Sequence, residues 1–360
     1  MKKTVNKSLI KCCLMFVLTF CISMIPVMLP AQDQKTLQPM PLFRSDEPLE
    51  LVLEADFSAV FAAKDDTTYF PAKMILTDND GQPRTVDLNI RKRGLTRARK
   101  DVCSFPPLRL NFPKKEMINT PFEGQNSIKL VTHCDKPDFY EDYTASEYLI
   151  YKSFNILTDS SFRVRPANIK YVFSNKKADT IYKFAFFLER EKHIAERLQG
   201  TELEKESIHP AQVDPGQACL VDIFEYMIGN TDYSIYELHN IIIVAEPERK
   251  HLSVPVPYDF DWSGLISANY AVPNPALNIS HVSERVYRGL KRDPAIISQT
   301  LEKFRSEKSA IYSLFETSPF LSANARKKAI KYLDGFYELI NDEKKAKSVF
   351  LDNAREVNNE

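Results

Sequence analysis

The chain has 360 residues, of which 44% are hydrophobic and 27% are charged, a composition typical of one large globular domain or two smaller ones. It excludes a disordered or fibrous protein. Lysine plus arginine and aspartate plus glutamate number 48 each, so no net charge draws the protein to nucleic acid or to an anionic membrane.

The first 31 residues predict a signal peptide for export. Lysines precede an apolar stretch over about residues 14–29, and the chain turns polar after Ala31. We expect cleavage after Ala31, a polar linker over residues 32–46, and a mature protein in the periplasm, the cell envelope or the extracellular medium. The alternative is an uncleaved membrane anchor. Leu29 is bulky for the −3 position of a signal-peptide cleavage site, and the apolar run is only marginally too short for a transmembrane helix.

Three of the six cysteines, Cys12, Cys13 and Cys21, lie in this first segment. In an oxidising compartment the remaining three would form one disulfide and leave one thiol. Cys103 and Cys134 each lie beside a strand-like run, so we predict that these two pair. The alternative is that all three stay buried thiols. No cysteine and histidine spacing typical of a zinc site is present.

Residues 47–200 predict a sheet-rich lobe with one long helix. Leucines that alternate with other residues from position 49 indicate a half-buried strand, and Asn79-Asp80-Gly81 has the chemistry of a tight hairpin turn. Apolar residues at near-helical spacing predict a long helix over residues 141–157. The predicted strands are 49–53, 69–77, 84–93, 107–112, 128–131, 167–173 and 181–188, followed by a short helix over 189–198.

Residues 201–360 predict a mainly helical lobe, and a charged stretch that begins at Gly200 marks the boundary. Helices are predicted over 217–228 and, as two helices, over 295–340. Two short strands, 240–244 and 252–256, lie between them. The whole chain is therefore expected to be an α+β protein with a sheet-rich N-terminal lobe and a helical C-terminal lobe.

Four oxygen-bearing side chains are expected at one end of these two short strands. Asp232 follows a helix in a polar turn, Asn240 opens the first strand, and Asp259 and Asp261 follow the second. A hairpin would bring them together, and such a cluster suits a Mg²⁺ or Mn²⁺ ion, since converging carboxylates repel one another without a cation. The alternative, which the spacing alone favours, is that these residues only cap turns and close a loop.

Several segments follow one another over about residues 85–265. They are Arg93-Gly94-Leu95-Thr96, strand 108–112, residues 127–133, helix 141–157, Asn230-Thr231-Asp232 with Asn240, and Pro257-Tyr258-Asp259-Phe260-Asp261. Their order resembles the spore-coat-protein-H (CotH) family of atypical protein kinases, and the last two segments are the most specific. Tyr258 stands where tryptophan is expected, and Asp259-Phe260-Asp261 lacks the glycine of an ordinary kinase DFG motif.

This resemblance implies a kinase-like fold and metal-dependent transfer of a phosphoryl group from ATP to a protein or envelope acceptor. Asp232 would be the catalytic aspartate, and Asn240 with Asp259 or Asp261 would hold Mg²⁺ or Mn²⁺. Which of the two late aspartates binds the metal stays open.

The phosphate-side candidates are Arg93, Arg109, Lys129 and Glu189. Arg93 lies in a dense basic run, and Arg109 and Lys129 alternate with apolar residues on strands, so either could point into a cleft as the nucleotide lysine does in kinases. Glu189 is a candidate ion-pair partner for them. The alternative for the basic run is a solvated surface.

Two other functions stay open. ATP is scarce outside the cytoplasm, so the chain could be a non-catalytic binding or structural protein of the envelope on a kinase-like scaffold. It could also be a metal-dependent phosphoesterase that uses water in place of an acceptor. Membrane contact is expected only if the N-terminal segment is uncleaved.

Overall fold

The computed structural model describes residues 37–175, 180–245 and 252–356. The predicted signal peptide, with its three cysteines, and the start of the predicted linker lie outside these residues. The rest of that linker contains the short 3-10 helix η1 (Pro41–Phe43), where Leu42 and Phe43 are buried.

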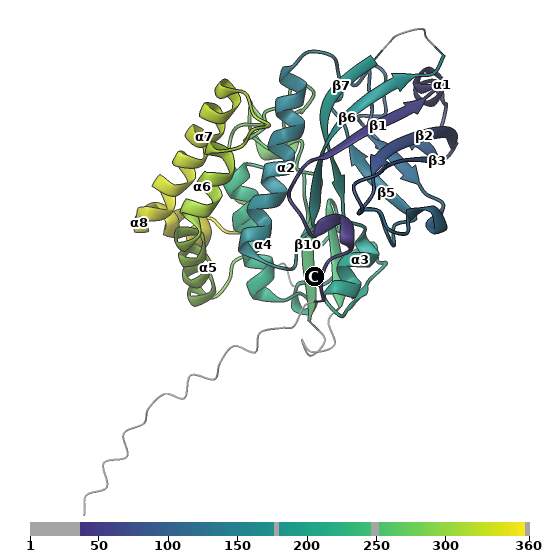
Figure 1. Ribbon diagram of the computed structural model, residues 1–360. Coiled ribbons are helices and arrows are strands. Elements are labelled where there is room, and N and C mark those ends of the chain that lie inside the picture. Colours follow the sequence, from purple (N-terminus) through teal and green to yellow (C-terminus); the bar gives the residue numbers. More distant parts are fainter. Residues whose placement is uncertain (1–36, 176–179, 246–251, 357–360) are drawn as a thin grey trace, which may run out of the picture. The chain divides into compact units, whose positions relative to one another are not determined.

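Within the described residues, seven strands close into a mixed barrel in the order β1-β2-β3-β4-β5-β7-β6 (Figure 1). Strand β1 pairs antiparallel with β2 and parallel with β6, and the parallel pair sets Leu49 opposite Ala167. The strands are β1 (Leu49–Ala55), β2 (Phe70–Thr77), β3 (Pro83–Lys92), β4 (Leu108–Asn111), β5 (Ser127–Val131), β6 (Val164–Phe173) and β7 (Thr180–Leu188).

The predicted kinase-like fold of two lobes is wrong: the strands form a closed barrel with helices packed around it. Hairpin chemistry correctly pairs β2 with β3, but closure depends on β1 meeting β6, whose residues come more than a hundred positions later. A period of two assigns each side chain to a face of a sheet. It does not indicate whether the two edges of that sheet meet.

The barrel interior is filled by alternate side chains of its strands and by helix α1 (Phe57–Ala62). Phe57 packs between Phe105 and Tyr171, with ring centroids 5.4 and 5.7 Å away. Helix α1 was not predicted, because six residues are too few for a helical period to appear in the sequence. Asp56 caps it by accepting the N–H of Ala59 at 3.0 Å.

The second half of strand β7 is buried on both faces and joins the barrel to the helices. Ala185 and Phe187 belong to the barrel core, whereas Phe186 and Leu188 belong to the second core. The helix α2 (Phe139–Leu157) packs against this second face, beside β6 and β7 (Figure 1).

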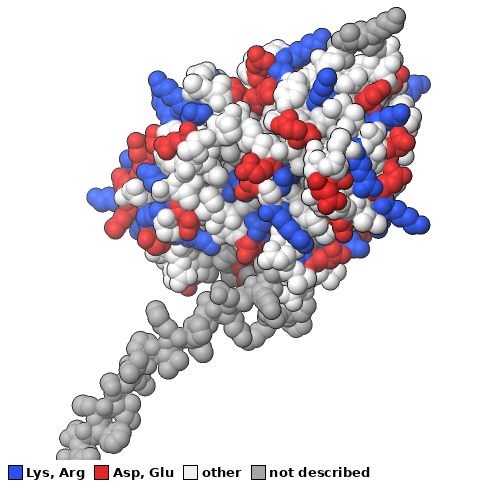
Figure 2. All heavy atoms as spheres, viewed as in Figure 1, with Lys and Arg blue, Asp and Glu red and all other residues white. Residues whose placement is uncertain are grey.

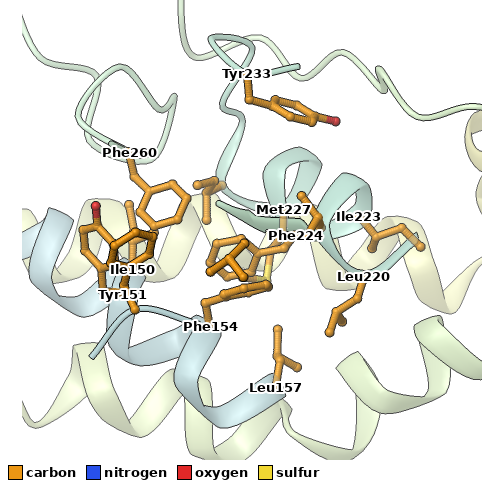
Figure 3. Packing of buried hydrophobic residues seen from close by; sticks show 14 of the residues in the cluster. Ile150, Tyr151, Phe154, Leu157, Leu220, Ile223, Phe224, Met227, Tyr233 and Phe260 are labelled. Atoms are coloured by element: carbon orange, nitrogen blue, oxygen red, sulfur yellow. The ribbon is translucent and has the colours of Figure 1, made fainter. Parts of the chain in front are cut away.

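The second core lies between α2 and α4 (Pro215–Ile228). Figure 3 shows Tyr151 and Phe154 of α2 beside Phe224 of α4, with Phe260 next to Tyr151. The rings of Phe154 and Phe224 are 4.6 Å apart, and those of Tyr151 and Phe260 are 4.7 Å apart. The predicted acidic loop is therefore anchored to the core by a buried phenylalanine between Asp259 and Asp261.

The C-terminal helices cover α4 on the side away from the barrel (Figure 1). The predicted two helices over 295–340 are three, because a single residue, Glu307, separates the first two and the apolar period continues across it. Across the described ranges, no helix has both the length and the hydrophobicity needed to cross a bilayer. The helices are α5 (Pro294–Ser306), α6 (Lys308–Glu316), α7 (Ala323–Asn341) and α8 (Glu343–Lys347).

A second, small sheet has the order β10-β9-β8. The predicted hairpin is confirmed: β9 (Ile241–Ala245) pairs antiparallel with β10 (Ser253–Pro257), and Ile241 lies opposite Pro257. Strand β8 (Thr201–Glu202) adds to β9, next to α3 (Glu191–Arg197).

Cys103 and Cys134, the predicted pair, are joined by a disulfide bond, and their Cα atoms lie 4.8 Å apart. Among the described cysteines Cys219 keeps a buried free thiol. On the face seen in Figure 2, acidic and basic side chains are interspersed, as the balanced charge of the chain leads one to expect.

Candidate functional site

The turn after helix α4 presents Asp232. The helix ends at Gly229, which adopts a left-handed φ of 67° that suits glycine at a helix C-terminus. Asn230 then donates its backbone N–H to the carbonyl of Glu225 at 2.8 Å, and its side-chain Oδ1 accepts the N–H of Asp232 at 3.0 Å. The turn leaves the Asp232 side chain 38% exposed.

Asn240 holds Asp232 from the start of β9. Its Nδ2 donates to the carbonyl of Asp232 at 2.7 Å and to the carboxylate Oδ2 at 3.2 Å. His239 Nε2 lies 3.0 Å from the other carboxylate oxygen. The backbone carbonyl of Asn240 accepts the N–H of Tyr258 at 3.0 Å, so Asp232 and Asn240 lie at the end of the hairpin from which Asp259 follows.

Asp259 and Asp261, two residues apart, have different surroundings. Asp259 has a φ of 64°, which is rare for a residue with a side chain, and its N–H donates to Tyr151 Oη of α2 at 2.8 Å. Its side chain is 43% exposed, whereas that of Asp261 is 10% exposed. Asp259 therefore faces the solvent, where a ligand could reach it, and Asp261 faces the interior.

Arg97 joins the buried carboxylates into one centre. Its Nε lies 3.3 Å from Asp261, its Nη1 lies 3.5 Å from Glu147 of α2, and its Nη2 lies 3.9 Å from Asp259. The Arg97 side chain is 7% exposed, so these contacts are shielded from water. Tyr270 also bonds to Asp261 through its side chain. We call Arg97, Glu147, Asp259 and Asp261 the Arg97 centre.

The Arg97 centre contains more carboxylates than its guanidinium can neutralise. Burial raises the pKa of Glu147 to about 8, and Asp261 and Asp259 add to that rise while Arg97 opposes it. Burial likewise raises the pKa of Asp261 to about 6, with Arg97 opposing, and Asp259 and Asp232 raise it further. The charge of Asp232 therefore lies within electrostatic range of Asp261.

Cations gather on the barrel side of this site. Arg109 lies opposite Lys129 in the β4–β5 ladder, and burial lowers the pKa of Arg109. Burial also lowers the pKa of Lys129, which Glu191 opposes while Arg93 and Arg109 lower it further. Arg93 is half-buried, with a pKa that burial lowers and Asp259 raises. The Nε atoms of Arg93 and Arg109 lack hydrogen-bond partners among the described residues.

Lys129 pairs with Glu191, at the start of α3, and its ammonium lies 5.3 Å from the ring centre of Tyr258. This places Lys129 beside the loop that carries Asp259. We call Arg93, Arg109 and Lys129 the cationic face.

Glu189, the predicted partner of these cations, is elsewhere. It is fully buried and pairs with Arg197, whose Nη2 lies 3.1 Å from Oε2 and whose Nε lies 3.3 Å from Oε1. It also accepts the backbone N–H of Arg163 at 2.9 Å. The prediction named the wrong glutamate by two positions, because β7 continues to Leu188 and only Glu191, beyond it, reaches Lys129.

The structure thus brings Asp232, Asn240, Asp259 and Asp261 to one site, with Arg93, Arg109 and Lys129 beside it. The sequence analysis missed the roles of Arg97, Glu147 and Glu191. Glu147 left a signal, since it lies at steps of four between the partly buried Tyr143 and the buried Tyr151, on the apolar side of the helix. A carboxylate in that position is expected to need a partner.

The oxygen-bearing side chains on the exposed side of the site suit a divalent ion that prefers oxygen ligands. The exposed carboxylates of Asp232 and Asp259, with the amide of Asn240, are the type of ligand that Mg²⁺ and Mn²⁺ bind, and such ions usually keep water or phosphate oxygens in their shell. No group of three or more histidine, cysteine, aspartate or glutamate side chains that could hold a metal occurs within the described ranges.

A cavity of about 660 Å³ lies on the α2 side of the loop that follows Asp261. Residues 264–267 and Asn269 line it, together with Tyr143 and Ser146 of α2 and Lys328 of α7. It does not include the carboxylates of the site. Ser146 directly precedes Glu147, and Asn269 directly precedes Tyr270, so the cavity and the Arg97 centre share two walls.

No known family model matches this chain, and a search of curated proteins finds none that matches it. The resemblance to CotH kinases therefore rests on the motifs alone and stays a hypothesis.

Proposed function

We propose that this protein is a metal-dependent phosphotransferase, of the type that CotH-like atypical kinases represent, which transfers a phosphoryl group from ATP to a hydroxyl of a protein or envelope acceptor. One observation carries the proposal. The negatively charged site of Asp232, Asp259 and the Arg97 centre adjoins the cationic face, and each has unbalanced charge. A nucleotide phosphate would neutralise the cationic face, and a divalent ion bound to it would neutralise the acidic side chains. The proposal depends on the site and not on the fold, because unrelated folds host the same chemistry.

Each residue then has a definite task. Asp232, held by Asn240 and exposed, would accept the proton of the acceptor hydroxyl. Asn240 and Asp259 would bind Mg²⁺ or Mn²⁺, which neutralises phosphate charge when bound. Between the two late aspartates we assign the metal to Asp259, because Asp261 is buried and engaged with Arg97 and Tyr270. Arg93, Arg109 and Lys129 would bind the phosphates.

The acceptor and the compartment follow from the same features. The disulfide between Cys103 and Cys134 agrees with an oxidising compartment, and so with export to the periplasm or beyond. The acceptor would then be an envelope or secreted molecule. The 660 Å³ cavity beside residues 264–267 is large enough for part of it.

The test is labelling of the purified chain 32–360 with γ-labelled ATP and Mg²⁺ or Mn²⁺. We expect Asp232→Ala to lower phosphoryl transfer by about 10²–10⁴-fold, the usual contribution of a general base, with an unchanged circular dichroism spectrum. Asp259→Asn is expected to raise the concentration of metal needed for labelling, because it removes a proposed metal ligand. Asp87→Asn, an exposed carboxylate on β3, is the matched control. Equal labelling of the wild type and both site variants would exclude a kinase.

One observation favours a second candidate, a non-catalytic binding protein of the envelope. Arg97 already neutralises part of the acidic centre, and His239 already contacts Asp232, so the site can fold without a metal. This candidate predicts nucleotide binding without labelling, and a biological role that survives Asp232→Ala.

A further inference from the structure

A buried glutamate precedes the turn that carries Asp232. Glu225, in the last turn of α4, is fully buried. Neither of its carboxyl oxygens has a hydrogen-bond partner of normal geometry among the described residues, and the same holds for Nδ2 of the fully buried Asn230. Leaving such groups unsatisfied costs stability, so a native protein that keeps them has another reason to do so.

Glu225 and Asn230 are nevertheless neighbours. Burial raises the pKa of Glu225 well above its usual range, and hydrogen bonding to the Asn230 side chain opposes this rise. Asp222 and Asp232 raise the pKa further, while Arg288 lowers it. Burial and neighbouring carboxylates therefore favour the protonated form of Glu225, and Asn230 lies near it without a hydrogen bond of normal geometry. Contacts of this kind at reactive sites often tighten when the ligand binds.

Asn230 connects Glu225 to Asp232 through the backbone. Its N–H donates to the Glu225 carbonyl, and its Oδ1 accepts the Asp232 N–H. On the other side of the turn, Arg288 Nη1 donates to the carbonyl of Thr231 at 2.5 Å. The Asn230 amide thus fixes the backbone of Asp232, whose carboxylate then contacts Asn240 and His239.

We propose that Glu225 is a positioning residue: its carboxyl group fixes the Asn230 amide, and Asn230 in turn holds the backbone of Asp232, to which the proposed metal ligand Asn240 is hydrogen-bonded. This inference rests on the proposed function, in which Asp232 and Asn240 face a metal–nucleotide complex. Residues that hydrogen-bond to the direct ligands of a metal usually raise the affinity for that metal by about 10- to 100-fold.

The test is calorimetric titration of Mn²⁺ with ADP into the chain 32–360. We expect Glu225→Met to weaken Mn²⁺ binding by about 10- to 100-fold, whereas Glu225→Gln, which keeps an acceptor for Asn230, retains the wild-type affinity. Glu225→Met should not lower the melting temperature, because it removes an unsatisfied buried polar group without changing the volume greatly. A purely structural glutamate would lower stability and leave the affinity unchanged.

Leu220→Ala, also buried in α4, is the control for stability alone: it should lower the melting temperature and keep the affinity. If Glu225→Met fails to fold, Asn230→Ala, which removes the connection itself, should weaken Mn²⁺ binding to the same extent. No Mn²⁺ binding by the wild type would overturn the proposed function. Wild-type binding with equal affinity in Glu225→Met, or in Asn230→Ala, would overturn the positioning role alone.

Discussion

The pair Glu189–Arg197 and the Arg97 centre are both buried groups of charged side chains, but their charges balance differently. Arg197 meets one glutamate and completes its bonding with the carbonyls of Asp159 and Ser161, at 2.7 and 2.6 Å. Arg97 instead faces Glu147, Asp259 and Asp261. The first group is closed. In the Arg97 centre the carboxylates outnumber the one guanidinium, and the Asp259 side chain is exposed to solvent.

This difference distinguishes a structural ion pair from a candidate site. A satisfied pair in the interior has nothing left to offer a ligand. A centre in which burial and like charges raise carboxyl pKa values, beside cations that crowd one another, can be completed by a ligand of opposite charge. The sequence analysis named Glu189 as a partner of the phosphate-side cations and missed Arg97, because residue type and position in the chain do not distinguish a closed ion pair from an open one.

The largest change in stability is expected when the buried pair Glu189–Arg197 is broken. Arg197→Met leaves Glu189 buried without its counter-charge and should lower the free energy of unfolding by about 3–5 kcal/mol. Urea unfolding near neutral pH measures it. The double variant Glu189→Gln with Arg197→Met should recover most of the loss. A loss below about 1 kcal/mol in the single variant would mean that the pair is not closed.

A medium effect is expected at Glu147, and it depends on pH. The folded-state pKa of about 8 lies above the unfolded value, so the native state holds a proton that the unfolded state releases. Stability contributed by this proton is present at low pH and is lost as pH rises toward 8. Between about pH 6.5 and pH 8 the wild type should lose about 2 kcal/mol, and Glu147→Gln should not. If the unfolding free energies of the wild type and of Glu147→Gln changed with pH at the same slope, the proposal that the Arg97 centre has excess carboxylates would be contradicted.

The smallest effect is expected at the exposed edge of the same centre. Asp259 is 43% exposed and only 3.9 Å from Arg97, so Asp259→Asn should change the free energy of unfolding by less than about 1 kcal/mol. Chemical denaturation of this variant beside Asp261→Asn separates the two aspartates. A larger change in Asp259→Asn than in Asp261→Asn would show that Asp259, and not Asp261, is the structural member.

Local structure was largely readable from the sequence. The strands β1 to β7, the helices α2 and α4 and the β9–β10 hairpin were predicted within a few residues, because each has a clear period or a turn with defined chemistry. The hairpin also placed Asn240 beside the chain that leads to Asp259. The short helix α1 and the break at Glu307 were missed, because each involves fewer residues than are needed to show a change in the hydrophobic period.

By itself the sequence determined which residues face inward along each strand and helix, and which acidic motifs end a common hairpin, because those properties depend on neighbours a few positions away. Only the tertiary structure decided that β1 meets β6 to close a barrel, that Arg97 faces Glu147 and Asp261, and that Lys129 pairs with Glu191 and not Glu189. These contacts join residues from about 50 to well over 100 positions apart. No local pattern encodes them, since they follow from how whole elements pack.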